Sequence, residues 1–206
     1  MANNIDYIIQ KINNIKNINI LELGVLRGDS TNKFLEICEK NDGYLTSIDI
    51  EDCSYVSKSR RWKFIHSSDD DFDKIDKIIS KNFDFIFIDS LHEPNHVKKI
   101  FYHYYNFLKN GGICIIDDIS WLPYTKHEYR DNEFSENINK STFNMILEIY
   151  YTNKENFNLE FFFKDTGYAI INKKSSKILN PSKKIISREY GIKNFIRKFY
   201  KRMPKK

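Results

Sequence analysis

The stretch that decides the fold is "ILELGVLRGDST", residues 20–31. A short apolar run with one internal acid, Glu22, is followed by two glycines four residues apart, Gly24 and Gly28. Glycine lets a chain turn tightly and leaves space beside its backbone. The "DST" that follows is typical of a helix start, whose free N–H groups can hold a carboxylate or phosphate. We therefore expect a strand, a ligand-binding loop and a helix, with Ser30 beside an anionic group.

The spacing of the two glycines argues against the common nucleotide-binding motifs. GxxxG departs from the GxGxxG of dinucleotide-binding folds, and the chain lacks the GxxxxGK[ST] of a P-loop. The loop therefore calls for a different ligand.

Strands and helices alternate along the first 120 residues. Apolar, β-branched runs predict strands, and segments of helical period lie between them. This alternation indicates a parallel sheet covered on both faces. The strands are expected at 17–25, 44–50, 62–67, 83–90 and 112–119, and the helices at 30–40, 72–81 and 94–109.

The chain ends its regular part differently. A helix is predicted near 139–151, and two further strands at 159–165 and 167–174 are separated by almost nothing. Such a short connection allows only antiparallel neighbours, because a parallel return needs a dozen or more residues. The sheet should therefore close with a hairpin.

Composition bounds the class of protein. The 206 residues suit one domain, and 41% hydrophobic with 30% charged residues excludes a disordered chain. The cysteines, Cys38, Cys53 and Cys114, form no CxxC pair, which favours a reducing compartment. Neither an uninterrupted apolar leader nor a run of ~18 apolar residues is present. We therefore expect a cytoplasmic protein.

Polar residues stand where the strands should end, and ligands of open parallel sheets bind there. Asp49 ends the second strand within "SIDIE", where a carboxylate can accept hydrogen bonds from ribose hydroxyls. Ser68 or Asp69, after the third strand, could meet an adenine amino group. Together these positions predict a nucleoside site.

In that order, "ELGVLRGDST", "SIDIE", "FDFIFIDSLH" and "GGICIIDDI" resemble the class I S-adenosylmethionine (SAM) methyltransferases. The last two are similar to the metal-dependent macrocin-type and antibiotic-sugar O-methyltransferases. The resemblance covers roughly residues 15–174 and implies a Rossmann-like α/β domain, set here at 1–176. It implies a seven-stranded sheet of order 3-2-1-4-5-7-6 with strand seven antiparallel. The implied contacts with SAM are Glu22, Gly24 and Gly28 near the methionine end, Ser30 at the carboxylate, Asp49 at the ribose, and Ser68 or Asp69 at the adenine.

Three carboxylates should meet beyond strands four and five. If those strands are neighbours, Asp89 faces Asp117 and Asp118 across ~4.8 Å. Carboxylates this close repel one another and raise at least one pKa, and a bound Mg²⁺ or similar cation relieves the repulsion. Such a cation could hold two vicinal hydroxyls and lower the pKa of one. In the alternative interpretation Asp89 contacts only SAM, and the other two cap the following turn.

Catalytic and acceptor-side residues follow the same strands. "IDSLH" places Leu91 where many relatives carry an acid, so His92 becomes the candidate base beside Asp89. His96 and His103 are expected to be ordinary surface or packing residues. Residues 120–136 could line an acceptor pocket. The candidates there are Trp121, which stacks on a sugar or is plain core, Tyr124 and Arg130.

The last thirty residues, 177–206, form a basic amphipathic tail. Residues 181–206 carry ten Lys/Arg and one acid, Glu189, a net charge of +9 in a chain of +5. From Ile192, apolar residues recur at helical spacing. Docking on the domain or on a second copy in a homo-oligomer is one interpretation. Contact with an anionic membrane surface or nucleic acid is the other.

These features predict a SAM-dependent O-methyltransferase that acts on a hydroxyl of a sugar or other small polyol, assisted by a divalent metal and His92. The alternatives are an RNA methyltransferase recruited by the basic tail and a non-catalytic SAM-binding subunit.

Overall fold

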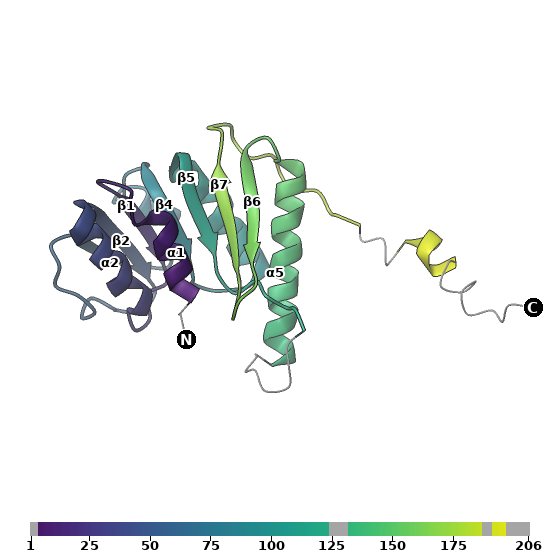
Figure 1. The fold of residues 1–206 in the computed structure, drawn as a ribbon, viewed down its shortest axis with the longest axis horizontal. Coiled ribbons are helices and arrows are strands. Elements are labelled where there is room, and N and C mark those ends of the chain that lie inside the picture. The colour runs from purple at the N-terminus through teal and green to yellow at the C-terminus, as the bar shows by residue number, and fades with distance from the viewer. Residues whose placement is uncertain (1–3, 124–131, 187–190, 197–206) are drawn as a thin grey trace, which may run out of the picture.

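A computed structural model describes residues 4–123, 132–186 and 191–196. Within these residues one seven-stranded sheet has the order β3-β2-β1-β4-β5-β7-β6 (Figure 1). Only β7 runs antiparallel to its neighbours, β5 and β6. The predicted Rossmann-like sheet is therefore confirmed. Its strands are β1 (Asn19–Leu23), β2 (Tyr44–Asp49), β3 (Trp62–His66), β4 (Phe83–Ile88), β5 (Leu108–Ile116), β6 (Phe157–Phe162) and β7 (Tyr168–Lys173).

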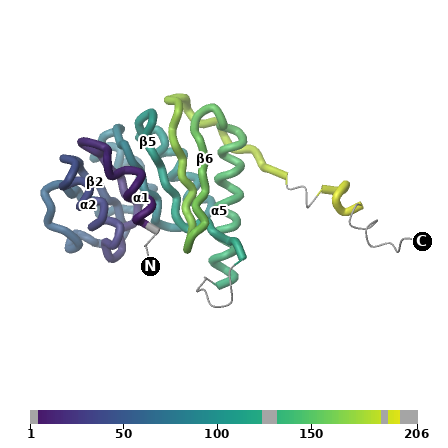
Figure 2. The backbone as a smooth tube through the Cα atoms, in the orientation of Figure 1, coloured from purple at the N-terminus to yellow at the C-terminus, as the bar shows by residue number. Residues whose placement is uncertain are grey.

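Helices cover both faces of the sheet (Figure 2). On one face α1 (Asn4–Ile12) and α2 (Asp29–Asn41) bury Ile8 and Phe34 completely. On the other, α4 (Pro94–Tyr104) and α5 (Glu133–Thr152) bury Ile100 and Ile149. A short α3 (Phe72–Ile75) and a 3₁₀ turn, η1 (Tyr105–Phe107), complete the elements. Burial of apolar side chains on both faces explains the continuous apolar runs of the central strands.

Three elements differ from the prediction. Helix α1 was not predicted, although its Ile5, Ile8 and Ile12 form a buried stripe at helical spacing. The helix expected over 72–81 ends at Ile75; beyond it Ile78 is exposed, and Ile79 packs against the core from a bend. Strand β5 begins at Leu108 rather than 112, and its pairing with β4 includes a register shift.

The hydrogen-bond ladder continues past the ends of the parallel strands and thereby aligns the expected site. Gly24 N–H donates to Ile48 O, and Asp89 N–H donates to Leu23 O. Asp117 N–H donates in turn to Ile88 O. The chain segments that leave β1, β4 and β5 therefore start side by side at one edge of the sheet.

The three cysteines are buried free thiols. None of the described helices combines the length and the apolar character that a membrane span requires.

Candidate cofactor site and acceptor side

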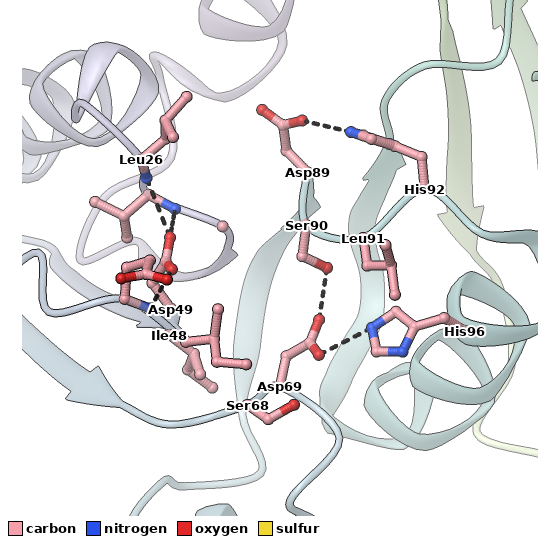
Figure 3. A pocket seen from close by; sticks show the side chains of 14 residues that line it. Leu26, Ile48, Asp49, Ser68, Asp69, Asp89, Ser90, Leu91, His92 and His96 are labelled. Atoms are coloured by element: carbon pink, nitrogen blue, oxygen red, sulfur yellow. Dashed lines mark hydrogen bonds and ion pairs between the residues drawn. The ribbon is translucent and has the colours of Figure 1, made fainter. Parts of the chain in front are cut away.

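A cavity of about 450 Å³ opens at the carboxyl ends of β1, β2 and β4 (Figure 3). Its wall is mostly apolar, with a few polar groups that converge on it. This is the usual character of a small-molecule site. The predicted residues that line it are Gly24, Asp49, Ser68, Asp69, Asp89 and His92.

Asp49 fixes the loop after β1. Its Oδ2 accepts hydrogen bonds from the backbone N–H groups of Val25 (2.7 Å) and Leu26 (3.1 Å), and Oδ1 accepts one from Glu51 N–H (2.8 Å). A carboxylate has about four acceptor positions. Asp49 therefore shapes the cavity and retains capacity for about one more donor, rather than standing free for two ribose hydroxyls.

The two glycines of the loop have different neighbours. Gly24 has φ +95°, and a Cβ there would lie 2.0 Å from the backbone oxygen of Asp89. Gly28 has φ +82°, and a Cβ would lie 2.2 Å from a Val56 methyl group. Gly24 thus allows the loop to pass against the end of β4 in the cavity wall. Gly28 lines neither this cavity nor the second one described below, and serves the turn into α2.

Glu22 is completely buried and lies outside both cavities. Its carboxylate accepts hydrogen bonds from the hydroxyls of Ser30 (2.6 Å), Thr31 (2.8 Å) and Ser47 (2.6 Å). Burial is the largest influence and raises the pKa of Glu22 to about 7, against the opposing effect of the three donors. Glu22 therefore ties the start of α2 to β1 and β2, where the sequence had placed it beside the ligand.

A second cluster of polar side chains surrounds Asp69, which is buried. Ser90 Oγ donates to Asp69 Oδ2 (2.5 Å), and His96 Nε2 lies 2.9 Å from Oδ1 without a well-aligned hydrogen bond. Tyr104 OH donates to the backbone oxygen of Asp69 (2.7 Å). Ser68 turns instead to Asp70 (2.6 Å). The carboxylate expected to meet an adenine is thus already held by two side chains.

His96 also lines the cavity, although the sequence analysis set it aside. Its position in the sequence indicated this, because His96 lies one turn after His92, in the first turn of α4. Its proximity to Asp69, which follows β3, could not be predicted from the sequence of α4 alone.

A second cavity, also about 450 Å³, lies between the starts of α1 and α2 and the ends of β4 and β5. Asp89 lines both cavities. Ser30 and two cations, Arg27 and Lys33, stand at its α2 wall; Lys33 Nζ also pairs with Asp6 (2.8 Å). A helix start with adjacent cations favours a carboxylate or phosphate. Asp29, Asp89 and Asp117 line the same cavity, so it offers both cationic and anionic side chains to a ligand.

His92 stands between two carboxylates. Its Nε2 lies 3.6 Å from Asp89 Oδ1 and 3.3 Å from Asp118 Oδ2. Asp118 has φ +57°, in the left-handed region. The preceding Asp117 uses Oδ1 to accept hydrogen bonds from Asp118 N–H (2.6 Å) and Thr166 Oγ1 (2.9 Å). The imidazole and both neighbouring acids therefore meet at the ends of β4 and β5.

The expected repulsion between the acids is present. Removal from water is the largest cause that raises the pKa of Asp89, followed by the charges of Asp117 and Asp118. Removal from water, then the charge of Asp118, also raises the pKa of Asp117. The hydrogen bonds from Asp118 N–H and Thr166 oppose that second shift.

The donor chemistry of these acids suits a hard cation, since Mg²⁺ prefers carboxylate oxygens. Their arrangement differs from the prediction. Across 4–123, 132–186 and 191–196, no three His, Cys, Asp or Glu side chains form a group arranged to hold a metal ion. Asp117 is engaged by Thr166, and Asp118 faces His92.

Trp121 lies in neither cavity. Its ring packs edge-on against Phe143 of α5, with centroids 6.1 Å apart, and Lys140 Nζ lies 4.7 Å from its centroid. Its buried Nε1 has no hydrogen-bond partner among the described residues. The packing interpretation of Trp121 matches this position better than the sugar-stacking one. Tyr124 and Arg130 lie outside the described residues.

Residues 21–119, just under half of the chain, match a family model described as "Methyltransferase domain". A search of curated protein sequences gave no match.

Several solved structures share the fold. A Staphylococcus aureus protein provisionally described as a caffeoyl-CoA O-methyltransferase superposes with a TM-score of 0.64 at 23% identity, over 84% of this chain and 85% of that one. The MycE methyltransferase of mycinamycin biosynthesis, solved with Mg, SAH and mycinamycin VI, gives 0.57 at 19%, over 84% of this chain and 49% of MycE. A Clostridium thermocellum protein provisionally described as an rRNA methylase gives a TM-score of 0.65 at 13% identity, over 85% of this chain and 98% of that one.

The matched residues include the loop after β1, the acid at the end of β2 and the paired ends of β4 and β5. The strand order is the one that the sequence resemblance implied. Residues 21–119 are therefore similar to a methyltransferase domain, and the described fold is the one that these solved methyltransferase structures share.

Proposed function

We propose that this protein is a SAM-dependent O-methyltransferase that acts on a hydroxyl of a sugar or other small polyol. One observation carries the proposal. His92, flanked by Asp89 and Asp118, stands in the wall of the first cavity, and Asp89 also lines the second. A proton acceptor therefore lies where the two cavities meet, which is where a methyl group between nucleoside and amino-acid ends of SAM would come.

The adenosine and methionine parts of SAM would occupy different cavities. The apolar first cavity, with Asp49 and Asp69 at its rim, suits the adenosine. The second cavity offers Arg27, Lys33 and the start of α2 to the methionine carboxylate, while the Ser30 hydroxyl stays bonded to Glu22. Gly24 allows the close approach of backbone segments between them. SAM would supply an already activated sulfonium methyl group.

The protein's own task is then alignment and removal of one proton. A hydroxyl held beside His92 gives its proton to Nε2 as its oxygen takes the methyl group. The carboxylate of Asp118, 3.3 Å from that nitrogen, stabilises the imidazolium that results. Asp89, 3.6 Å away, contributes less, because its raised pKa favours the neutral form. Each proton acquired at Nε2 leaves to solvent, because the His92 side chain is about one-third exposed.

We also propose that a divalent cation such as Mg²⁺ assists. Asp89, Asp117 and Asp118 would hold it, and it would orient vicinal hydroxyls and make one more acidic. Their donor chemistry and the repulsion that raises the pKa of Asp89 support the cation. The absence of a three-residue ligand group among the described residues counts against it.

The decisive experiment replaces His92 and measures binding and turnover separately. Transfer of labelled methyl groups from SAM is screened against nucleotide sugars, glycans and RNA, with and without Mg²⁺. For the best acceptor, His92→Ala should lower kcat by about 100-fold or more, while calorimetry with S-adenosylhomocysteine shows unchanged affinity. His103→Gln, in α4 but in neither cavity, is the matched control.

Three outcomes would overturn the proposal. Near-normal turnover by His92→Ala would remove the base. Transfer to RNA alone would favour the nucleic-acid enzyme. Tight binding without transfer to any acceptor would favour the non-catalytic subunit.

A further inference from the structure

The C-terminal segment presents an apolar face that no part of the described chain covers. Residues 192–196 are helical. Ile192 is 80% exposed, Phe195 73% and Ile196 46%. Positions i, i+3 and i+4 share one side of a helix. Large apolar side chains grouped in this way usually mark a binding surface.

The same segment is strongly basic. Lys193 lies within the helical turn, and residues 181–206 as a whole carry ten Lys/Arg against one acid. In the sequence the apolar spacing continues with Phe199 and Met203 between basic residues. An apolar stripe beside dense positive charge is the pattern of helices that lie in the interface of an anionic bilayer.

The chain reaches this segment from a fixed point on the domain. Leu179 is buried in the core, and Asn180 N–H donates to Asn153 Oδ1 (2.8 Å). Tyr102 OH donates to Asn180 O (2.9 Å), and Lys183 N–H donates to Thr152 Oγ1 (3.1 Å). Residues 179–183 are therefore bound to the C-terminal ends of α4 and α5.

Those helix ends lie away from the cavities. Pro94 begins α4 just after the cavity residues of β4, and α5 approaches the same edge where Thr142 Oγ1 bonds His92 O. Both helices then run to the opposite end of the sheet, where the described residues up to Ile186 lead away from the domain in Figure 1. Attachment of the tail to a surface would therefore leave the cavities open.

We propose that the helix beginning at Ile192 binds the surface of an anionic lipid bilayer. Ile192, Phe195 and Ile196 enter the interface, and the lysines and arginines contact anionic headgroups. A bilayer satisfies both the apolar and the basic features. A nucleic acid would use the charge but leave the two isoleucines in water. This proposal is independent of the reaction proposed above.

The test is co-sedimentation of the full chain with two kinds of vesicle: phosphatidylcholine alone, and phosphatidylcholine with about one-third phosphatidylglycerol. We expect binding to the anionic vesicles only, reduced by raised salt. Ile192→Ser/Phe195→Ser should lower that affinity at least about tenfold. Ile178→Ser is the matched control, because Ile178 is 81% exposed but precedes residues 179–183, which are bound to the domain. This variant should bind the vesicles like the wild type. Circular dichroism and calorimetry with S-adenosylhomocysteine check that each variant is folded.

Each other result counts against the proposal. Failure of the wild type to bind either vesicle would overturn it. Equal binding of the double variant would reduce the contact to charge alone, without an inserted face. Tight binding to single-stranded RNA, unchanged in the double variant and without binding to vesicles, would identify a nucleic-acid partner.

Discussion

Asp49 Oδ2 accepts a 2.7 Å hydrogen bond from the backbone N–H of Val25, so the acid that ends β2 holds the loop that follows β1. The same oxygen receives Leu26 N–H. Removal of the carboxylate should therefore remove a ligand contact and also release Val25 and Leu26, which line the cavity. We expect Asp49→Ala to weaken binding of S-adenosylhomocysteine by about 100-fold, because one charge-assisted contact with the ligand is lost and the loop after β1 is no longer held in place.

Calorimetry measures this, with Glu51→Gln as a control on the same rim. Asp49→Asn should fall between, because its NH₂ cannot accept from Glu51 N–H. If the alanine variant lost less than about threefold in affinity for S-adenosylhomocysteine, the hydrogen bonds of Asp49 to the loop would not be needed for binding.

The close contact of Gly24 with Asp89 gives a second prediction. A Cβ at Gly24 would lie 2.0 Å from a backbone oxygen, so the end of β4 must shift. At Gly111 the φ is similarly positive, +81°, but nothing lies within 4 Å. Gly111→Ala should cost about 1 kcal/mol from its backbone conformation alone. Gly24→Ala should cost at least about 2 kcal/mol more.

Urea unfolding of the two variants compares these free energies. Equal losses would mean that the β1 loop can move away from β4 without cost.

The part of the fold that was predictable from sequence follows from local pattern. Alternating strands and helices predict a parallel sheet, and the short turn before β7 predicts an antiparallel hairpin. The order of the strands came only from the family resemblance. The misses share one cause. The apolar stripe of α1 forms a helix, and the segment after Ile75 does not. In both cases the outcome depends on burial against elements that are distant in sequence.

The site divides in the same way. Topology alone brings Asp49, Asp89 and His92 to one edge, because each follows a parallel strand. The partner of each side chain was not readable. Glu22 lines neither cavity and lies among Ser30, Thr31 and Ser47, of which Ser47 comes from a different strand.

The proposed cation makes a separate prediction. If Asp89, Asp117 and Asp118 hold Mg²⁺ during turnover, EDTA should lower the rate at least about tenfold, and added Mg²⁺ should restore it. Asp117→Asn should raise the Mg²⁺ concentration required. Initial rates over a Mg²⁺ titration measure both effects. Full activity in EDTA would leave proton removal to His92 without a metal.

The buried Glu22 predicts how stability changes with pH. Its pKa is raised by burial from 4.5 to about 7, so the folded state keeps a proton that the unfolded state has lost. The contribution of this group to stability is therefore full below about pH 4.5 and declines as pH rises to about 7. Glu22→Gln removes the decline. The free energy of unfolding of the variant, relative to the wild type, should rise by about 1–3 kcal/mol across that range.

Urea unfolding at several pH values measures that difference. The pKa values of Asp89 and Asp117 are raised in the wild type. The charge of Glu22 is the smallest of the influences on Asp89 and none of those on Asp117, so the difference comes mainly from Glu22. Glu36→Gln, at an exposed position of the same helix α2, should follow the wild-type curve. Parallel curves for Glu22→Gln and the wild type would mean that Ser30, Thr31 and Ser47 hold the carboxylate ionised despite its burial.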